Sequence, residues 1–268
     1  MIDVHCHLNF HAFEKDVDEV IQKAFEDGVT KIINVGTKID SSIKAVELAN
    51  QYENLYAIVG IHPHHADKIE QRWGKQLEKL AKNKKVVAIG ECGMDYYRYK
   101  SNDIVDPKLQ KQVFVKQIEL AHKLKLPLQI HNRHAGKDII DILINHKSYL
   151  LNPPGMFHCM SGDIALLKKV LDLGFYVGFD GNITYKGIAP GETTELKDLV
   201  QYTPVERIVA ETDSPFLTPV PKRGSRNIPS YVILVGRKIA EIKGLSFQKV
   251  EEQTTENANY LFKLDANI

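Results

Sequence analysis

The chain has 268 residues, of which 43% are hydrophobic and 26% charged, as is usual for a folded protein with a sizeable core. Its formal net charge of +1 excludes a global field that attracts nucleic acid, so a polyanion would have to meet a local cluster of cations. No apolar run reaches the roughly 18 residues that cross a bilayer, and no signal-peptide pattern opens the chain, so we expect a cytoplasmic protein that does not bind membranes.

Hydrophobic periodicity predicts short strands that alternate with helices. The opening stretch Ile2–His7 is predicted to be extended, and further strands are predicted at Lys31–Gly36, Leu55–Gly60, Val86–Gly90, Leu126–Ile130, Gly155–Cys159, Phe175–Phe179 and Arg207–Ala210. Helices are predicted at Phe13–Phe25, Ser41–Gln51, Gln71–Lys82, Pro107–Leu124, Asp138–Asn145, Ile164–Leu173, Thr194–Tyr202, Tyr231–Ile242 and Phe247–Leu261.

This alternation predicts parallel βαβ units, and eight of them favour a closed (β/α)8 TIM barrel, an α/β fold, over an open sheet. The alternative is an open doubly wound sheet. It is weakened because no glycine-rich dinucleotide or phosphate-binding motif follows the first strand. No linker, repeat or low-complexity tract divides the chain, so we expect residues 1–268 to form one domain.

Potential metal ligands recur where the predicted strands end, and in a barrel those ends meet at one face. His5 and His7 lie two residues apart in a strand, so their side chains point the same way. Taken singly, such residues are more often hydrogen-bonded histidines or helix caps. Together they are too many for one tetrahedral ion but suit two ions bridged by a carboxylate. The six candidates are His5, His7, Glu91, His131, His158 and Asp213.

The three cysteines, Cys6, Cys92 and Cys159, are an odd number in a long chain, which argues against a disulfide framework. Each directly follows a candidate ligand. Strand alternation therefore predicts that they face away from the site as small buried apolar residues.

Eight short motifs, in this order, make the chain resemble the TatD family of metal-dependent deoxyribonucleases over essentially its whole length. They are Asp3–His7, Gly60–His64, Gly90–Tyr97, Gln129–Arg133, Phe157–Gly162, Gly181–Tyr185, Glu211–Pro215 and Thr255–Asn257. Two positions depart from the family pattern and put the substrate preference in question: His134 stands where Asp is frequent, and Ile228 where Glu is frequent.

The resemblance implies two divalent ions and phosphodiester hydrolysis, with release of nucleotides from DNA ends. One ion would be held by His5, His7, Glu91 and Asp213, and Glu91 would bridge to a second held by His131 and His158. Mg or Mn is compatible with the activity, while Zn, Ni or Fe could be the bound ion. The expected substrate is a short single-stranded DNA end, and no obligate protein partner is expected.

Beside the ligands, we expect Asp213 to act as general base and His62 to contact the scissile phosphate or the leaving group. Orienting another ligand is an equally good role for His62, and His64 and His65 are expected to face solvent. Arginine side chains suit phosphate oxygens, and tyrosines could stack on an unpaired base or pack the loop onto the barrel. The candidates are Arg98, Arg133, Arg223 and Arg226, with Tyr96, Tyr97 and Tyr99.

Two other functions remain open. The same barrel supports hydrolysis of C–N or carboxylic ester bonds, including an aminoacyl ester on tRNA. In many such amidases a carboxylated lysine bridges the ions, so Glu91 at that place favours the nuclease interpretation. A metal-binding protein without catalytic activity would explain the ligands but not the basic and aromatic loops around them.

Overall fold

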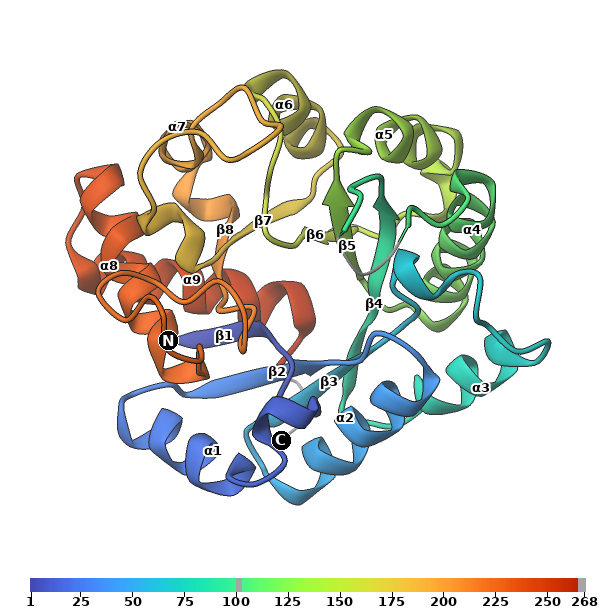
Figure 1. The fold of residues 1–268 in the computed structure, drawn as a ribbon, viewed down its shortest axis with the longest axis horizontal. Coiled ribbons are helices and arrows are strands. Elements are labelled where there is room, and N and C mark those ends of the chain that lie inside the picture. Colours follow the sequence, from blue (N-terminus) through green and yellow to red (C-terminus); the bar gives the residue numbers. More distant parts are fainter. Residues whose placement is uncertain (100–102, 265–268) are drawn as a thin grey trace.

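Eight parallel strands follow one another around a barrel in chain order, with helices on the outside (Figure 1). The computed structural model describes residues 1–99 and 103–264. The strands are β1 (Ile2–Cys6), β2 (Lys31–Val35), β3 (Leu55–Val59), β4 (Val86–Asp95), β5 (Leu128–Arg133), β6 (Gly155–Phe157), β7 (Tyr176–Phe179) and β8 (Ile208–Ala210). Unbroken sequential order confirms the predicted TIM barrel and excludes a doubly wound sheet, whose strand order reverses direction.

The helices lie close to their predicted ranges. Over the described residues they are α1 (Val17–Glu26), α2 (Ile39–Gln51), α3 (Trp73–Leu80), α4 (Pro107–Leu124), α5 (Gly136–Asn145), α6 (Ile164–Asp172), α7 (Leu196–Tyr202), α8 (Val232–Lys243) and α9 (Phe247–Phe262). None of these helices is long and apolar enough to cross a membrane.

The bounds of α4 agree with the prediction because its ends are encoded locally. The Asp106 side chain accepts a hydrogen bond from the Lys108 N–H at 2.8 Å, and Pro107 occupies the first turn. The α1 prediction began too early. Phe13 belongs instead to a short 3-10 turn, His11–Phe13, where its ring is fully buried.

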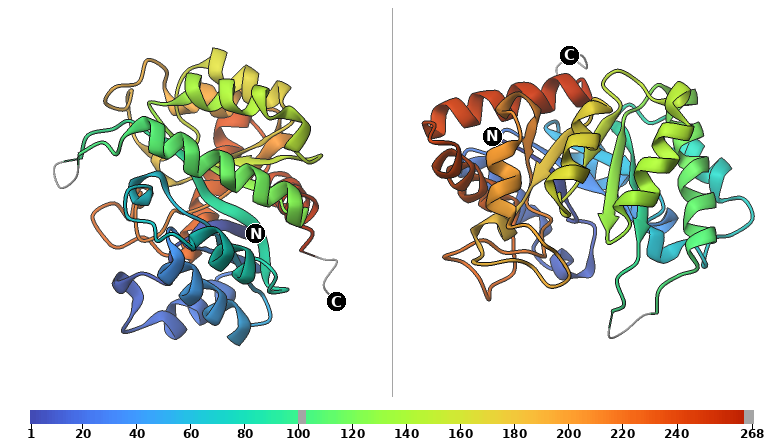
Figure 2. Two further views of the ribbon diagram at one scale, coloured as in Figure 1. Left: turned by 90° about the vertical axis from the view of Figure 1, so that its right-hand side faces the viewer. Right: turned by 90° about the horizontal axis from the view of Figure 1, so that it is seen from above.

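Two apolar layers place the functional site at one end of the barrel. An inner core fills the barrel and an outer core lies between strands and helices. Ala258 and Leu261 of α9 belong to the inner core, so this helix covers the N-terminal end of the barrel. The opposite end, from which the loops after β4 and β8 project in Figure 2, is left for the site.

The barrel closes between β1 and β8 at the place where the predicted ligands lie. The Asp213 N–H donates to His5 O at 2.9 Å, and the His7 N–H donates to Ser214 O at 2.8 Å. Deeper in the wall, Asp3 accepts hydrogen bonds from the Thr212 backbone N–H (2.9 Å) and hydroxyl (2.7 Å).

An irregularity in β1 turns the two histidines toward the barrel axis. Ile2 and Val4 belong to the inner core, so strict alternation would send His5 and His7 outward. The register between β1 and β2 shifts between Asp3 and Cys6, which is typical of a β-bulge. Val4 and His5 therefore both face inward, and Cys6 faces the outer core.

Strand β4 runs to Asp95, five residues beyond the predicted end at Gly90. The extension is paired with β5 as far as Asp95 and Arg133. The side chain of Gln110 in α4 also bonds the N–H and the carbonyl of Asp95, at 2.8 and 2.9 Å. Gly93 allows the close approach of the two strands, because its φ is +138° and a Cβ there would lie 2.1 Å from His131 O.

We expect Gly93→Ala to lower the free energy of unfolding by about 3 kcal/mol or more, because the backbone must adopt a strained φ and move away from His131. Chemical denaturation measures the effect. Gly28→Ala is the matched control, since Gly28 also has a positive φ (+100°) but no atom within 4 Å of the added Cβ. It should cost only about 1–2 kcal/mol. Equal losses in the two variants would contradict the close approach.

Candidate metal centre

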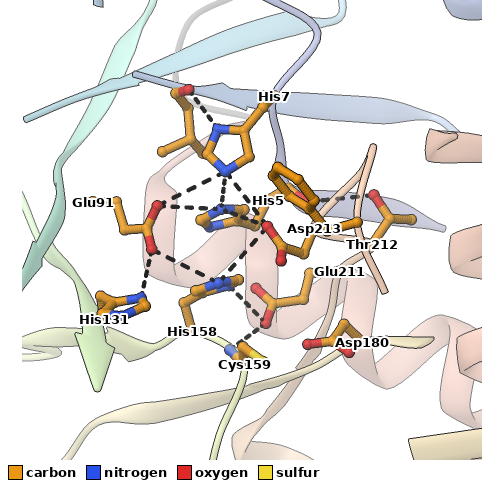
Figure 3. A network of polar contacts seen from close by, with 12 residues as sticks. His5, His7, Glu91, His131, His158, Cys159, Asp180, Glu211, Thr212 and Asp213 are labelled. Atoms are coloured by element: carbon orange, nitrogen blue, oxygen red, sulfur yellow. Dashed lines mark hydrogen bonds and ion pairs between the residues drawn. The ribbon is translucent and has the colours of Figure 1, made fainter. Parts of the chain in front are cut away.

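The six predicted ligands converge at the C-terminal end of the barrel (Figure 3). Those whose side chains are almost completely buried are His5, His7, Glu91 and His158; His131 and Asp213 keep 15% and 14% of their side-chain surface exposed. Each comes from a strand or from the residues directly after one, namely β1, β4, β5, β6 and β8. The sequence prediction that they meet at one place thus agrees with the geometry.

The first group of ligand atoms surrounds one point. His5 Nε2 lies 3.1 Å from His7 Nε2, and each nitrogen lies 3.8 Å from Glu91 Oε2. Asp213 Oδ1 lies 3.5 and 3.4 Å from the same two nitrogens. Ligand atoms about 2.1 Å from a shared ion lie about 3.0–3.4 Å from one another. A small inward movement of the two carboxylates would therefore bring these four atoms to distances that suit a divalent cation.

The hydrogen-bond partners of His5 and His7 determine which ring nitrogens face this point as acceptors. His7 Nδ1 donates to Val35 O at 2.9 Å. His5 Nδ1 donates to Gln129 Oε1 at 2.8 Å, since the Gln129 amide nitrogen donates to Val4 O. In neutral rings both Nε2 atoms therefore carry lone pairs. Two such nitrogens and two carboxylate oxygens, all of them acceptors, face one another, an arrangement that a metal ion satisfies.

A second group lies on the other side of Glu91. Its Oε1 contacts His131 Nδ1 at 2.7 Å and lies 3.9 Å from His158 Nε2, while its Oε2 faces the first group. Nitrogen and carboxylate donors in this combination suit Zn, Mn or Fe. The residues present therefore fit a metal centre in which Glu91 lies between two groups of ligand atoms.

Outer carboxylates orient the two histidines of the second group. His131 Nε2 contacts Asp95 Oδ2 at 3.1 Å, and His158 Nδ1 contacts Glu211 Oε1 at 3.0 Å. The latter is an ion-pair contact rather than a well-directed hydrogen bond, and Glu211 Oε1 also accepts the Cys159 N–H at 2.6 Å. Carboxylates in such positions fix the ring and raise its basicity.

Charge within the centre shifts several pKa values. Burial alone would lower the pKa of His131, but its contacts with Asp95 and Glu91 raise it to about 9. Burial likewise opposes protonation of His158, and Glu211 and Asp213 raise its pKa to about 10. Without a bound cation, protons on His131 and His158 therefore balance the negative charge of the neighbouring carboxylates.

The predicted catalytic side chain of His62 also faces Glu91, with its Nε2 3.6 Å from Oε1. Its Nδ1 accepts the His64 N–H at 3.1 Å, so a neutral ring carries its proton on Nε2. Burial keeps the pKa of His62 well below its usual value. His62 is thus a neutral hydrogen-bond donor aimed into the site.

The expectation that His64 and His65 face solvent is wrong. His64 is only 19% exposed in its side chain and contacts Asp95 Oδ2 at 3.0 Å, and His65 is half-buried. His64 is turned inward by the buried carboxylate of Asp95, which also accepts hydrogen bonds from the Tyr99 hydroxyl and the Tyr97 N–H.

Of the predicted substrate-binding arginines, Arg133 lies nearest in sequence to a ligand, and its guanidinium covers the Tyr97 ring at 4.2 Å. The other three have protein partners outside the cluster, and a role in substrate binding stays a prediction for all four. Arg98 pairs with Asp103, Arg223 covers the Tyr185 ring, and Arg226 pairs with Asp16. Tyr96 donates its hydroxyl to Asp138 at 2.7 Å.

The remaining expectations have mixed outcomes. Cys6 and Cys92 are buried free thiols in the outer core, as predicted, but Cys159 is only partly buried. It follows β6 with a φ of +45° and accepts a hydrogen bond from the Asn182 side chain. Of the two departures from the family pattern, His134 lies 3.7 Å from Glu192, and Ile228 packs against the outer core.

Sequence reasoning missed Asp95, Gln129 and Glu211 as partners of the ligands. A usable signal existed for Gln129, which precedes the predicted ligand His131 by two residues within β5 and so shares its face.

Comparison with known proteins gives the same picture along the whole chain. The family model described as TatD related DNase matches residues 2–263. The chain is 38% identical to a Bacillus subtilis protein described as an uncharacterized metal-dependent hydrolase, YabD, over 99% of this chain and all of that protein. It is 32% identical to the 3′-5′ ssDNA/RNA exonuclease TatD of Klebsiella pneumoniae, covering 100% of this chain and 99% of that protein. The crystal structure of YjjV, a TatD homologue from Escherichia coli, superposes with a TM-score of 0.87 at 28% identity, covering 98% of each chain.

Metal binding by chelator-treated protein should release protons, because a metal needs the neutral rings of His131 and His158, whose pKa values are raised to about 9 and about 10. The affinity should therefore rise with pH below about 9, roughly tenfold per pH unit for each proton released. Titration calorimetry in buffers with different ionisation enthalpies counts the protons. His131→Asn should lower the count, whereas the control His122→Gln, at an exposed histidine, should not. An affinity that is constant with pH would contradict the charge balance.

Proposed function

Because the chain belongs to the TatD family of metal-dependent hydrolases, we propose that it hydrolyses phosphodiester bonds at the ends of DNA, using two divalent ions that share Glu91. The name of the Klebsiella pneumoniae relative, a 3′-5′ ssDNA/RNA exonuclease, supports a nucleic-acid substrate.

One observation carries the proposal. The two oxygens of Glu91 face different histidine pairs, and the histidines on the Oε2 side present lone pairs to each other at 3.1 Å. His5, His7 and Asp213 would hold one ion with Glu91, and His131 and His158 would hold the other. When bound, such ions lower the pKa of water and offset negative charge on phosphate oxygens.

The chain's own groups would then handle the protons. The carboxylate of Asp213 accepts the proton of the attacking water, as a general base next to the reacting phosphorus. His62 presents its Nε2–H to the phosphate or the leaving oxygen, and its low pKa keeps it a neutral donor rather than a base.

Substrate grip is proposed to come from Arg133, with Tyr97 and Tyr99 beside it. The guanidinium lies 4.2 Å from the Tyr97 ring centre and 5.4 Å from that of Tyr99, so a cation and two flat rings stand next to His131. Such a group can hold both the phosphate and the base of an unpaired nucleotide. With a net charge of only +1, a short contact with a strand end fits better than an extended duplex interface.

The decisive test uses chelator-stripped protein with 3′-labelled and 5′-labelled single-stranded oligonucleotides, with Mg or Mn added back. We expect stepwise shortening from one end that needs the metal and is lost in Glu91→Ala. Undiminished cutting of circular DNA would contradict action at ends. Absence of cleavage by protein that holds two metals would favour an amide or aminoacyl-ester substrate.

Asp213→Asn should lower kcat on such an oligonucleotide by about 100- to 10,000-fold, because an amide cannot accept the proton of water. Its oxygen can still face the metal, so the metal content should be kept. Single-turnover kinetics and metal analysis give the two readouts. Asp67→Asn, at an exposed carboxylate, is the matched control. Full turnover by Asp213→Asn with metal bound would exclude Asp213 as the base.

A further inference from the structure

Phe216 is a half-exposed aromatic side chain at the edge of the metal centre. It lies three residues after Asp213, and 51% of its surface is accessible. A single exposed hydrophobic residue is common on protein surfaces and needs no explanation. This one differs from such residues in its contacts and in the rigidity of its backbone.

The Phe216 ring forms one side of a corner built on a ligand. Phe10 stacks on the His7 ring, with centroids 4.4 Å apart and planes 10° from parallel. Phe216 meets both rings edge-on, at 6.4 Å from His7 and 6.3 Å from Phe10. The corner, Phe10 with Phe216, therefore stands directly beside the first ligand group.

The backbone that presents Phe216 is fixed from below. Its N–H donates to Asp213 O at 2.8 Å, and its carbonyl accepts from the Asn227 side chain at 2.6 Å. Asn227 is fully buried and also donates to Thr212 O at 2.8 Å. These hydrogen bonds fix the backbone of Phe216, so the exposed ring does not stand on a loose loop.

Arg226 ties together the two loops that carry the corner. Its guanidinium forms two contacts with the Asp16 carboxylate, at 2.9 and 2.6 Å, and another with Ala12 O. It also covers the Phe13 ring at 4.6 Å. These contacts join the segment after β8 to the segment after β1, so Phe216 and Phe10 keep their relative positions.

The corner lies across the barrel mouth from the Tyr97 and Arg133 group. Strand order places β1 and β8 opposite β4 and β5 in an eight-stranded barrel, and Figure 1 shows these pairs on opposite sides. Flat rings therefore stand on both sides of the metal centre. A phosphodiester at the centre has a nucleotide on each side.

We propose that the Phe10–Phe216 corner is a stacking subsite for one of the two bases that flank the scissile phosphate. This inference rests on the proposed function. A base is a flat ring one sugar away from the phosphate, and stacking on an aromatic side chain tolerates any of the four bases. The subsite requires the base to be unpaired and so selects a single-stranded end.

The test compares the protein with Phe216→Ala on oligonucleotides that are intact or lack the base at the last or the penultimate position. Loss of the stack should raise KM on the intact strand roughly 5- to 150-fold. Removing the matching base should raise the KM of the unaltered protein similarly, with no further increase in Phe216→Ala. Phe216→Tyr should keep the low KM.

Ile188→Ala is the matched control, because Ile188 is equally exposed (52%) in the loop after β7. Anisotropy with a labelled strand whose end linkages are phosphorothioates gives the affinities independently of turnover. Metal content and melting temperature report whether the corner supports His7 instead.

The outcomes separate the two proposals. If the unaltered protein shortens oligonucleotides and Phe216→Ala has the same KM, or loses kcat equally on intact and abasic strands, the stacking subsite is overturned and the nuclease function stands. If the unaltered protein neither binds nor cleaves oligonucleotides, the proposed function fails, and the subsite fails with it.

Discussion

Mutual repulsion among the lone pairs of His5, His7, Glu91 and Asp213 is the constraint on which the rest of the structure depends. Four acceptor atoms within 3.1–3.8 Å of their neighbours are unfavourable in a buried place unless a proton or a cation lies between them. The fold must therefore hold the ligands together against this repulsion before a metal ion arrives. Rings that keep their outer nitrogens bonded cannot turn away, so the site is organised in advance for a cation.

Hydrogen bonds between β1 and the segment after β8, where the barrel closes, hold the ligands together. Asp3 accepts hydrogen bonds from the backbone N–H and the hydroxyl of Thr212, next to the strand ends that carry His5 and Asp213. Asp213 itself has a φ of +54°, a conformation that costs a non-glycine residue about 1–2 kcal/mol. Such strain persists only where surrounding contacts determine the backbone, and here the Asp213 N–H is bonded to His5 O. The hydrogen bond that closes the barrel between β1 and the segment after β8 therefore also positions the ligand Asp213.

The sequence allowed the fold and the six converging residues to be predicted, because periodicity and strand ends are local signals. The partners of the ligands depend on tertiary details. Ile2 and Val4 face the barrel interior, so strict strand alternation without the bulge in β1 would make His5 face outward. No local sequence pattern predicts this bulge. Asp95 escaped notice because β4 seemed to end at Gly90. Strand alternation does identify the face that Gln129 shares with His131, whereas Glu211 and Asp213 lie beyond the end of β8, where Asp213 leaves the extended conformation.

Arg226 illustrates why charge alone does not identify a substrate contact. Its place in a basic loop after Asp213 favours phosphate binding, yet Asp16 binds its guanidinium in a bidentate manner. A phosphate would have to replace a well-matched carboxylate, and the loop would lose its tie to the segment after β1. The same contact instead fixes a neutral aromatic corner beside the metal ligands. In a protein with almost no net charge, the proposed recognition of an unpaired end would then depend on shape and stacking near the centre, and divalent cations held by the ligands would supply the attraction for phosphate.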